Sequence, residues 1–179
     1  MRSFTHTFLA SLTTLVLAAA SLSGTVGASP QHDHDHGVVA APRAFAPQKA
    51  APANVPLPPL PSEGYAPSRP MEVVKATYEF AARHPEVLQY VPCYCGCDRS
   101  AGHRGNHDCF VKRRGADGRI LEWDSHGYGC AICMDVARDS MQLFNSGAKP
   151  AAIRAAIDAK YGSRLPTTMN TPKPPAASK

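Results

Sequence analysis

The sequence has no cysteine before residue 93 or after residue 133, although six cysteines lie between these positions. It also lacks a nucleophile elbow, a phosphate-binding loop and a pair of catalytic carboxylates, so it gives no support to hydrolytic chemistry. Its formal net charge is only +5, and its one basic cluster, residues 112–114, is accompanied by no basic stripe. Nucleic-acid binding is therefore not expected. The feature that calls for an explanation is the local density of cysteine.

The first 28 residues have the pattern of an export signal. Arg2 is followed by an interrupted apolar stretch at residues 8–22 and by the small residues 26–28. We therefore expect a signal peptide over residues 1–28. The apolar stretch is shorter than the roughly 20 residues that cross a bilayer comfortably, so no stable membrane span is expected after cleavage. No cysteine lies near the cleavage point to carry a lipid, which favours a periplasmic or secreted product.

Two segments have compositions typical of disorder. Residues 29–67 are rich in His, Ala and Pro and are predicted to form a disordered linker. The alternating histidines and aspartates at 32–36 could capture metal weakly or could simply be a solvated tail. Residues 166–179 are polar and proline-rich and are predicted to form a disordered tail.

Between them, residues 68–165 predict a small, mainly α-helical domain. Apolar periodicity indicates about three helices: one that begins near Pro70 and stops at His84-Pro85, one between residues 129 and 147, and one between residues 150 and 162. Residues 109–111 and 119–123 could pair across Asp117-Gly118 as a short β-hairpin. The remaining residues are expected to form an irregular, cysteine-rich lobe.

Three of the cysteines alternate along Pro92-Cys93-Tyr94-Cys95-Gly96-Cys97. A smooth strand would spread these sulfurs over two pleats. Gly96 allows backbone conformations closed to other residues, so it can fold the run back and bring the sulfurs together. Cys109 and the pair Cys130-x-x-Cys133 follow downstream, and a helix that begins at this pair favours thiolate in its first turn.

This set of sulfurs predicts a metal site. A structural zinc site needs only four ligands, so six cysteines suggest a binuclear thiolate cluster or a copper(I) site. Copper is slightly favoured over zinc because thiolates are soft ligands. The expected partner is thus a metal ion, copper or zinc, and a binding protein is favoured over an enzyme. The predicted ligands are thiolates, with two histidines as auxiliary groups: Cys93, Cys95, Cys97, Cys109, Cys130, Cys133, His107 and His126.

Two other interpretations stay open. The spacing of Cys130 and Cys133 is that of dithiol oxidoreductases, so the protein could act in thiol–disulfide exchange with an envelope redox partner. In an oxidising compartment six cysteines could also form three structural disulfides in an interaction protein. Disulfides between such close neighbours in the motif would constrain little of the unfolded chain.

The string at residues 92–97 resembles the signature of the bacterial PCYCGC-motif family. The resemblance runs from His84 to Gly162 and implies an extracytoplasmic protein, with no defined reaction. A weaker resemblance, over residues 130–162, is to helical thiol-oxidoreductase subunits of c-type cytochrome maturation. Gly129 stands where those subunits have arginine, and Met134 follows Cys133 where haem attachment would need histidine.

Overall fold

The computed structural model describes residues 45–61, 66–165, 167 and 169–176. The predicted signal segment and the histidine run at 32–36 lie outside the described residues. No helix among the residues described is both long enough and apolar enough to cross a membrane. The regular elements are, in chain order, α1 (Met71–Arg83), α2 (Pro85–Leu88), α3 (Cys97–Ala101), a 3-10 helix η1 (Asn106–Cys109), β1 (Val111–Arg114), β2 (Ile120–Trp123), α4 (His126–Gly129), α5 (Ala131–Asn145) and α6 (Pro150–Tyr161).

The three long helices begin and end near the residues that the sequence indicates. Helix α1 follows Pro70 and stops at His84, because the residue before a proline is pushed out of helical geometry. Helix α5 is followed by Gly147, whose φ of 87° lies in the left-handed region that glycine tolerates. Helix α6 begins with Pro150 in its first turn, where proline loses no hydrogen bond.

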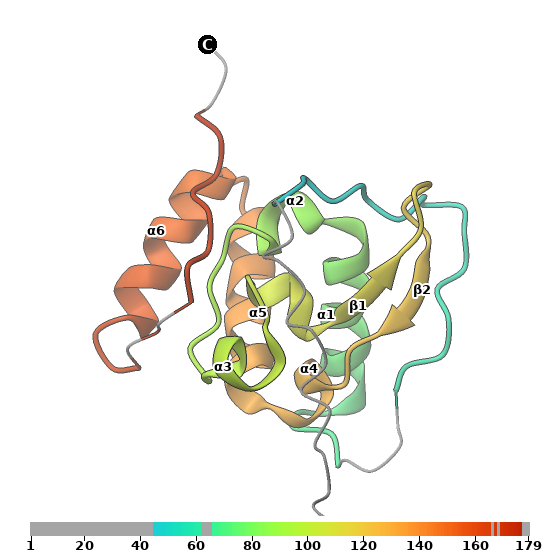
Figure 1. Ribbon diagram of the computed structural model, residues 1–179, viewed down its shortest axis with the longest axis horizontal. Coiled ribbons are helices and arrows are strands. Elements are labelled where there is room, and N and C mark those ends of the chain that lie inside the picture. Colours follow the sequence, from blue (N-terminus) through green and yellow to red (C-terminus); the bar gives the residue numbers. More distant parts are fainter. Residues whose placement is uncertain (1–44, 62–65, 166, 168, 177–179) are drawn as a thin grey trace, which may run out of the picture. The chain divides into compact units, whose positions relative to one another are not determined.

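Helix α5 lies at the centre of the helical layer. It contacts both α1 and α6, as Figure 1 shows. Val74 of α1, Val136 of α5 and Ile153 of α6 are completely buried in the shared core. Burying an aliphatic side chain of this size contributes about 1.5–3 kcal/mol, so these faces stabilise the layer.

The mainly α-helical class is confirmed, but a count of about three helices is not. The described residues contain six α-helices, three of which have only four or five residues. Helices this short complete barely one turn, so they produce no apolar periodicity in the sequence. They belong to the irregular part of the chain that carries the cysteines.

A hairpin is present as predicted, but its first strand covers residues 111–114 and not 109–111, because Cys109 ends η1. Strands β1 and β2 pair antiparallel, with Val111 opposite Trp123 and Arg114 opposite Ile120 (Figure 1). Gly118 sits in the turn with a φ of 89°, and a Cβ atom there would collide with the carbonyl oxygen of Ala50. The turn therefore requires glycine both for its backbone angle and for the close approach of the upstream segment.

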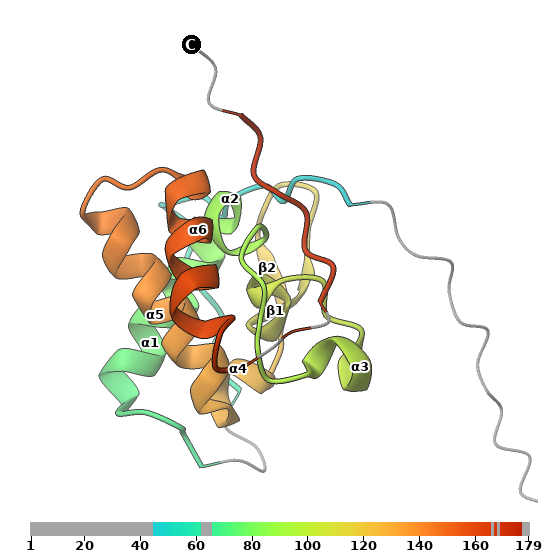
Figure 2. The same cartoon turned by 90° about the vertical axis from the view of Figure 1, so that its left-hand side faces the viewer.

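The described residues that flank the domain contact it. The amide of Ala51 donates to the carbonyl of Ala82, and Trp123 Nε1 donates to the carbonyl of Pro58 at 3.1 Å. At the other end, the carbonyl of Thr171 accepts from Arg154 of α6 at 3.3 Å. Figure 2 shows this C-terminal segment running beside α6 and past the loop that leads to α3.

Candidate metal centre

The backbone of the PCYCGC motif is folded back at its glycine. Gly96 has a φ of 83° and is the residue that precedes α3, so Cys97 lies on a new helix instead of continuing an extended run. The Sγ atoms of Cys93 and Cys95 are 3.3 Å apart. The turn at Gly96 brings Cys97 Sγ within 4.8 Å of Cys93 Sγ, as the sequence predicts, whereas a smooth strand would hold these two sulfurs far apart.

The aromatic residue of the motif fixes it to the helical layer. The hydroxyl of Tyr94 donates to Asp158 of α6 at 2.8 Å, and its ring stacks on that of Tyr161 with centroids 5.7 Å apart. Asn106, which is completely buried, donates from its backbone to the carbonyl of Val91 and from its amide to the carbonyl of Cys133 at 3.1 Å. These bonds hold the motif and η1 against α5.

All six cysteines come together in two overlapping groups. Within each group the sulfurs lie within 4.8 Å of one another, and Cys133 belongs to both. A tetrahedral ion with bonds of about 2.3 Å to sulfur separates its ligands by roughly 3.8 Å, which these spacings can accommodate. The arrangement can therefore hold a metal ion. The first group is Cys93, Cys97, Cys109 and Cys133, and the second is Cys95, Cys130 and Cys133.

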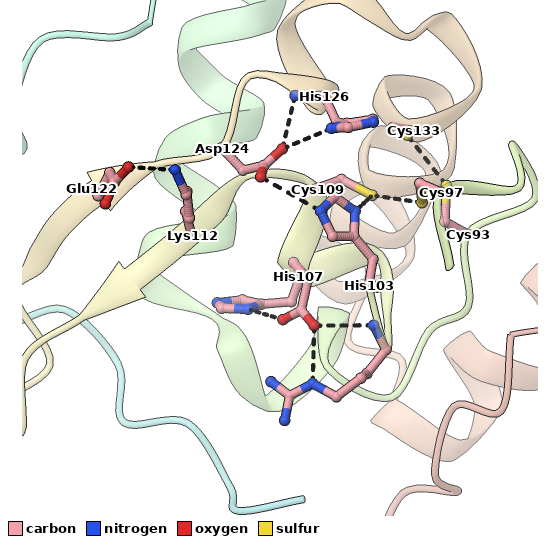
Figure 3. A network of polar contacts seen from close by, with 12 residues as sticks. Cys93, Cys97, His103, His107, Cys109, Lys112, Glu122, Asp124, His126 and Cys133 are labelled. Atoms are coloured by element: carbon pink, nitrogen blue, oxygen red, sulfur yellow. Dashed lines mark hydrogen bonds and ion pairs between the residues drawn. The ribbon is translucent and has the colours of Figure 1, made fainter. Parts of the chain in front are cut away.

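Close sulfur–sulfur contacts link the motif to α5 and to η1. The Sγ atom of Cys133 is 3.2 Å from that of Cys93 and 3.4 Å from that of Cys95, while Cys97 Sγ is 3.5 Å from Cys109 Sγ. Figure 3 shows Cys93, Cys97, Cys109 and Cys133 converging from separate parts of the chain. Three segments far apart in the sequence thus contribute sulfur to one place.

The two groups differ in their access to solvent. The sulfur-bearing residues of the first are all buried, with exposures of 0–2 %. Cys95 and Cys130, by contrast, are only partly buried. Cys130 immediately precedes α5, and Cys133 lies in the first turn of that helix. The cluster therefore has a buried part and an accessible part.

Electrostatics favour a cation at this place. Hydrogen bonds to Cys130 and Cys133 lower the pKa of Cys95 to about 3, whereas contact with Cys109 and Cys130 raises the pKa of Cys133. Some of the sulfurs become thiolates at the expense of their neighbours, because like charges at this distance repel. A bound metal ion would remove that conflict and allow the sulfurs to ionise together.

None of the six cysteines is in a disulfide. The short sulfur–sulfur contacts of 3.2–3.5 Å are well beyond the bond length of about 2.05 Å. Structural disulfides are therefore not supported by the described residues.

The two predicted auxiliary histidines lie outside the sulfur groups. His107 is buried, with Nε2 3.1 Å from a guanidinium nitrogen of Arg114 and Nδ1 3.5 Å from Asp108. It belongs to none of the metal-holding groups among the described residues. His126 is 41 % exposed and pairs through Nδ1 with Asp124 at 3.2 Å.

The histidine that contacts a sulfur is His103, which the ligand set predicted from the sequence did not include. Its Nδ1 is 3.5 Å from Cys109 Sγ and its Nε2 is 3.4 Å from Asp124 (Figure 3). Although burial opposes the charged form, the hydrogen bonds to Asp124 and Cys109 raise the pKa of His103 to about 10. Gly102, with a φ of 69°, turns the chain after α3 and so directs His103 back toward the cluster.

A methionine from the C-terminal segment also reaches the motif. The amide of Cys93 donates to Met169 Sδ at 3.2 Å, and the hydroxyl of Thr167 donates to the carbonyl of Cys93 at 2.7 Å. Met134, which follows Cys133 in the sequence, is instead completely buried in the core. The signal for Met169 is absent from local sequence because it lies far along the chain from the motif.

Comparison with known families decides the identity. A family model described as "Protein of unknown function with PCYCGC motif" matches residues 12–174. The chain belongs to the PCYCGC-motif family. The match extends well beyond the motif and includes all six cysteines, His103, Asp124 and Met169. No curated protein and no solved structure matches the chain.

Proposed function

We propose that this PCYCGC-family protein is an extracytoplasmic metal-binding protein whose six cysteines hold two soft metal ions. The observation that carries the proposal is the position of Cys133, which is shared by a group of four sulfurs and a group of three. A thiolate has enough lone pairs to bridge two ions, so a shared cysteine is what a binuclear cluster requires. A single tetrahedral site would leave two of the six cysteines without a role.

Copper(I) is the ion we favour, with zinc as the alternative. Soft thiolate ligands select copper(I), and a group of only three sulfurs suits it better than zinc, which takes four ligands. Met169 adds a thioether beside Cys93, and thioether is another soft ligand type.

The unequal burial of the two groups suggests how the ions are used. An ion held by the four buried cysteines would be retained, since no partner can reach their sulfurs without opening the domain. An ion held through Cys95 and Cys130 would be open to exchange at the surface. We infer that the protein stores or delivers metal through this accessible side, to an envelope protein that handles metals.

The test is metal stoichiometry in two paired variants, each the control for the other. Wild-type protein purified without chelator should hold two ions in native mass spectrometry. Cys95→Ser combined with Cys130→Ser should lose the accessible ion and keep the buried one. Cys97→Ser combined with Cys109→Ser should lose the buried ion and keep the accessible one. Wild-type metal content in both double variants would reject the cluster.

Thiol–disulfide exchange is the second candidate, and the geometry of α5 is the observation in its favour. Cys130 is partly exposed immediately before the helix and Cys133 follows in the first turn, as a dithiol centre requires. If exchange is the function, Cys130→Ser should abolish reduction of a mixed-disulfide substrate, and Cys97→Ser should leave its rate unchanged. Equal rates in wild type and Cys130→Ser would exclude this reaction.

A further inference from the structure

Three polar side chains form a group of their own beside the sulfurs. His103, Asp124 and His126 each offer one ligand atom, and these atoms lie within 4.8 Å of one another. Asp124 stands between the histidines, with one carboxylate oxygen 3.4 Å from His103 Nε2 and the other 3.2 Å from His126 Nδ1. Figure 3 shows both imidazoles turned toward this carboxylate, and their ring centroids are 4.8 Å apart.

The backbone holds the carboxylate of this group in place. Asp124 follows β2 directly; its amide donates to the carbonyl of Phe110 at 2.8 Å, and its carbonyl accepts from the hydroxyl of Tyr78 at 2.7 Å. Phe110 and Tyr78 are both completely buried. The group is therefore built on a rigid part of the fold, and only His126 has substantial exposure, at 41 % of its side chain.

His103 connects this group to the thiolate cluster. Nε2 is turned to the group, and Nδ1 is 3.5 Å from Cys109 Sγ. Once a cation displaces the proton from Nε2, the imidazole can offer a lone pair there and still donate a hydrogen bond from Nδ1 to sulfur. Metal-bound histidines are oriented in this way by a hydrogen bond from their second nitrogen. The sulfur of Cys109 would fix both the tautomer and the direction of the ring.

Solvent reaches the group from the side of the accessible cysteines. A hollow of about 220 Å³ is lined by Ser125, His126, Gly129 and Cys130. A small hydrated cation fits such a space, which both His126 and Cys130 border.

We propose that His103, Asp124 and His126 form a separate metal position, outside the thiolate cluster, that binds a divalent cation of borderline softness such as Zn²⁺. Two imidazoles and one carboxylate are the ligand set of such a cation, and water would complete the tetrahedron. The position goes beyond the proposed thiolate cluster because none of its ligand atoms is sulfur. It requires no reaction and no change in the oxidation state of the ion.

The experiment adds Zn²⁺ to the full chain after its thiols have been loaded with copper(I). His32, His34 and His36 are replaced by asparagine in every sample, since that run could bind zinc by itself. Calorimetry measures the affinity, and X-ray absorption at the zinc edge reads only the ligands of zinc. Zinc–nitrogen and zinc–oxygen bonds of about 2.0–2.2 Å differ clearly from zinc–sulfur bonds of about 2.3 Å.

We expect one zinc per chain with nitrogen and oxygen ligands. His126→Ala and Asp124→Asn should each weaken its binding at least about tenfold, because even groups that only orient a ligand contribute that much. Asparagine keeps an oxygen that can accept the hydrogen bond from the amide of His126, which protects the fold of this turn. His84→Ala is the matched control, since His84 also pairs with a carboxylate, Glu86 at 2.9 Å, but belongs to no metal-holding group of the described residues.

Three results would overturn this metal position: zinc bound through sulfur, no zinc bound at all, or equal zinc affinity in His126→Ala and wild type. Its failure is distinguishable from failure of the thiolate cluster. If copper(I) is retained but zinc is not bound, the cluster stands and this position falls. If copper(I) is not retained and zinc binding still depends on Asp124 and His126, the position stands alone.

Discussion

The helical layer and the cysteine lobe of this protein bury very different interiors. The helical layer, α1, α5 and α6, is closed by aliphatic side chains such as Val74, Val136 and Ile153, all with no exposed surface. The cysteine lobe, residues 92–110, contains only α3 and η1 as regular elements, and its buried side chains include thiols, imidazoles and an amide. We expect the first region to be stabilised mainly by the hydrophobic effect, and the second, which buries many polar groups, to depend more on other interactions.

The largest effect should therefore come from removing metal. We expect chelation of the reduced protein to lower hydrogen-exchange protection throughout the cysteine lobe without unfolding it completely, while protection of α1 and of the C-terminal half of α5 stays unchanged. Structural zinc contributes of order 10 kcal/mol to small domains, so loss of metal should have a larger effect than loss of any single side-chain contact in the lobe. Equal protection of the lobe with and without metal, measured by mass spectrometry, would show that the two regions do not differ in this way.

A substitution in the hydrophobic core should affect the helical layer and leave metal binding unchanged. Ile153→Ala should lower the free energy of unfolding by about 2–5 kcal/mol, because it leaves a cavity in a fully buried site. Metal content should not change, since no cysteine lies on α6. Leu121→Ala is the control: its side chain is 49 % exposed, and we expect a change within about 0.5 kcal/mol in urea unfolding. Metal loss in Ile153→Ala would mean that the layer and the lobe fold as one unit.

A smaller and pH-dependent effect is expected within the lobe, at Asp108. Burial opposes its ionisation, but hydrogen bonds to His107 and Arg104 lower its pKa to about 2 from 3.8. A depressed pKa stabilises the folded state above the unfolded value, and this contribution is lost as the pH falls from about 4 to about 2. Asp108→Asn should thus destabilise the metal-free protein by on the order of 2 kcal/mol at neutral pH.

The measurement compares urea unfolding of wild type and Asp108→Asn at several pH values in the reduced, metal-free state. The difference between them should shrink toward zero near pH 2. A difference independent of pH would assign the effect to lost hydrogen bonds and not to the charge.

The helical layer and the cysteine lobe also differ in how much of their structure could be predicted from the sequence. The helical layer follows local rules: apolar periodicity gives α1 and α5, His84-Pro85 gives the end of α1, and Gly147 follows the end of α5. Even there, Ala156 faces solvent on α6, although its spacing of three residues from Ile153 would place it on the apolar face of the helix. Alanine carries too little surface to fix the orientation of a helix.

The cysteine lobe was predictable in composition but not in arrangement. The dense sulfurs indicate a metal site, yet which histidine reaches them depends on how Gly102 turns the chain after α3. His103 and His107 are four residues apart, a spacing that would place both on one face of a helix, but Gly102 and Gly105 disfavour a helix there. The spacing therefore could not identify His103 as the neighbour of Cys109. Contacts from distant segments, such as Met169 with Cys93, have no local signal at all.

The shared position of Cys133 has a consequence for regulation. If one sulfur serves both ions, the two binding equilibria are thermodynamically coupled, and by reciprocity each ion changes the affinity for the other by the same factor. A partner that removes the accessible ion would then change the affinity of the protein for the buried ion, although the partner never contacts the four buried cysteines. Binding of the two ions would therefore be cooperative, and a binding curve fitted with two independent sites would give wrong values for both affinities.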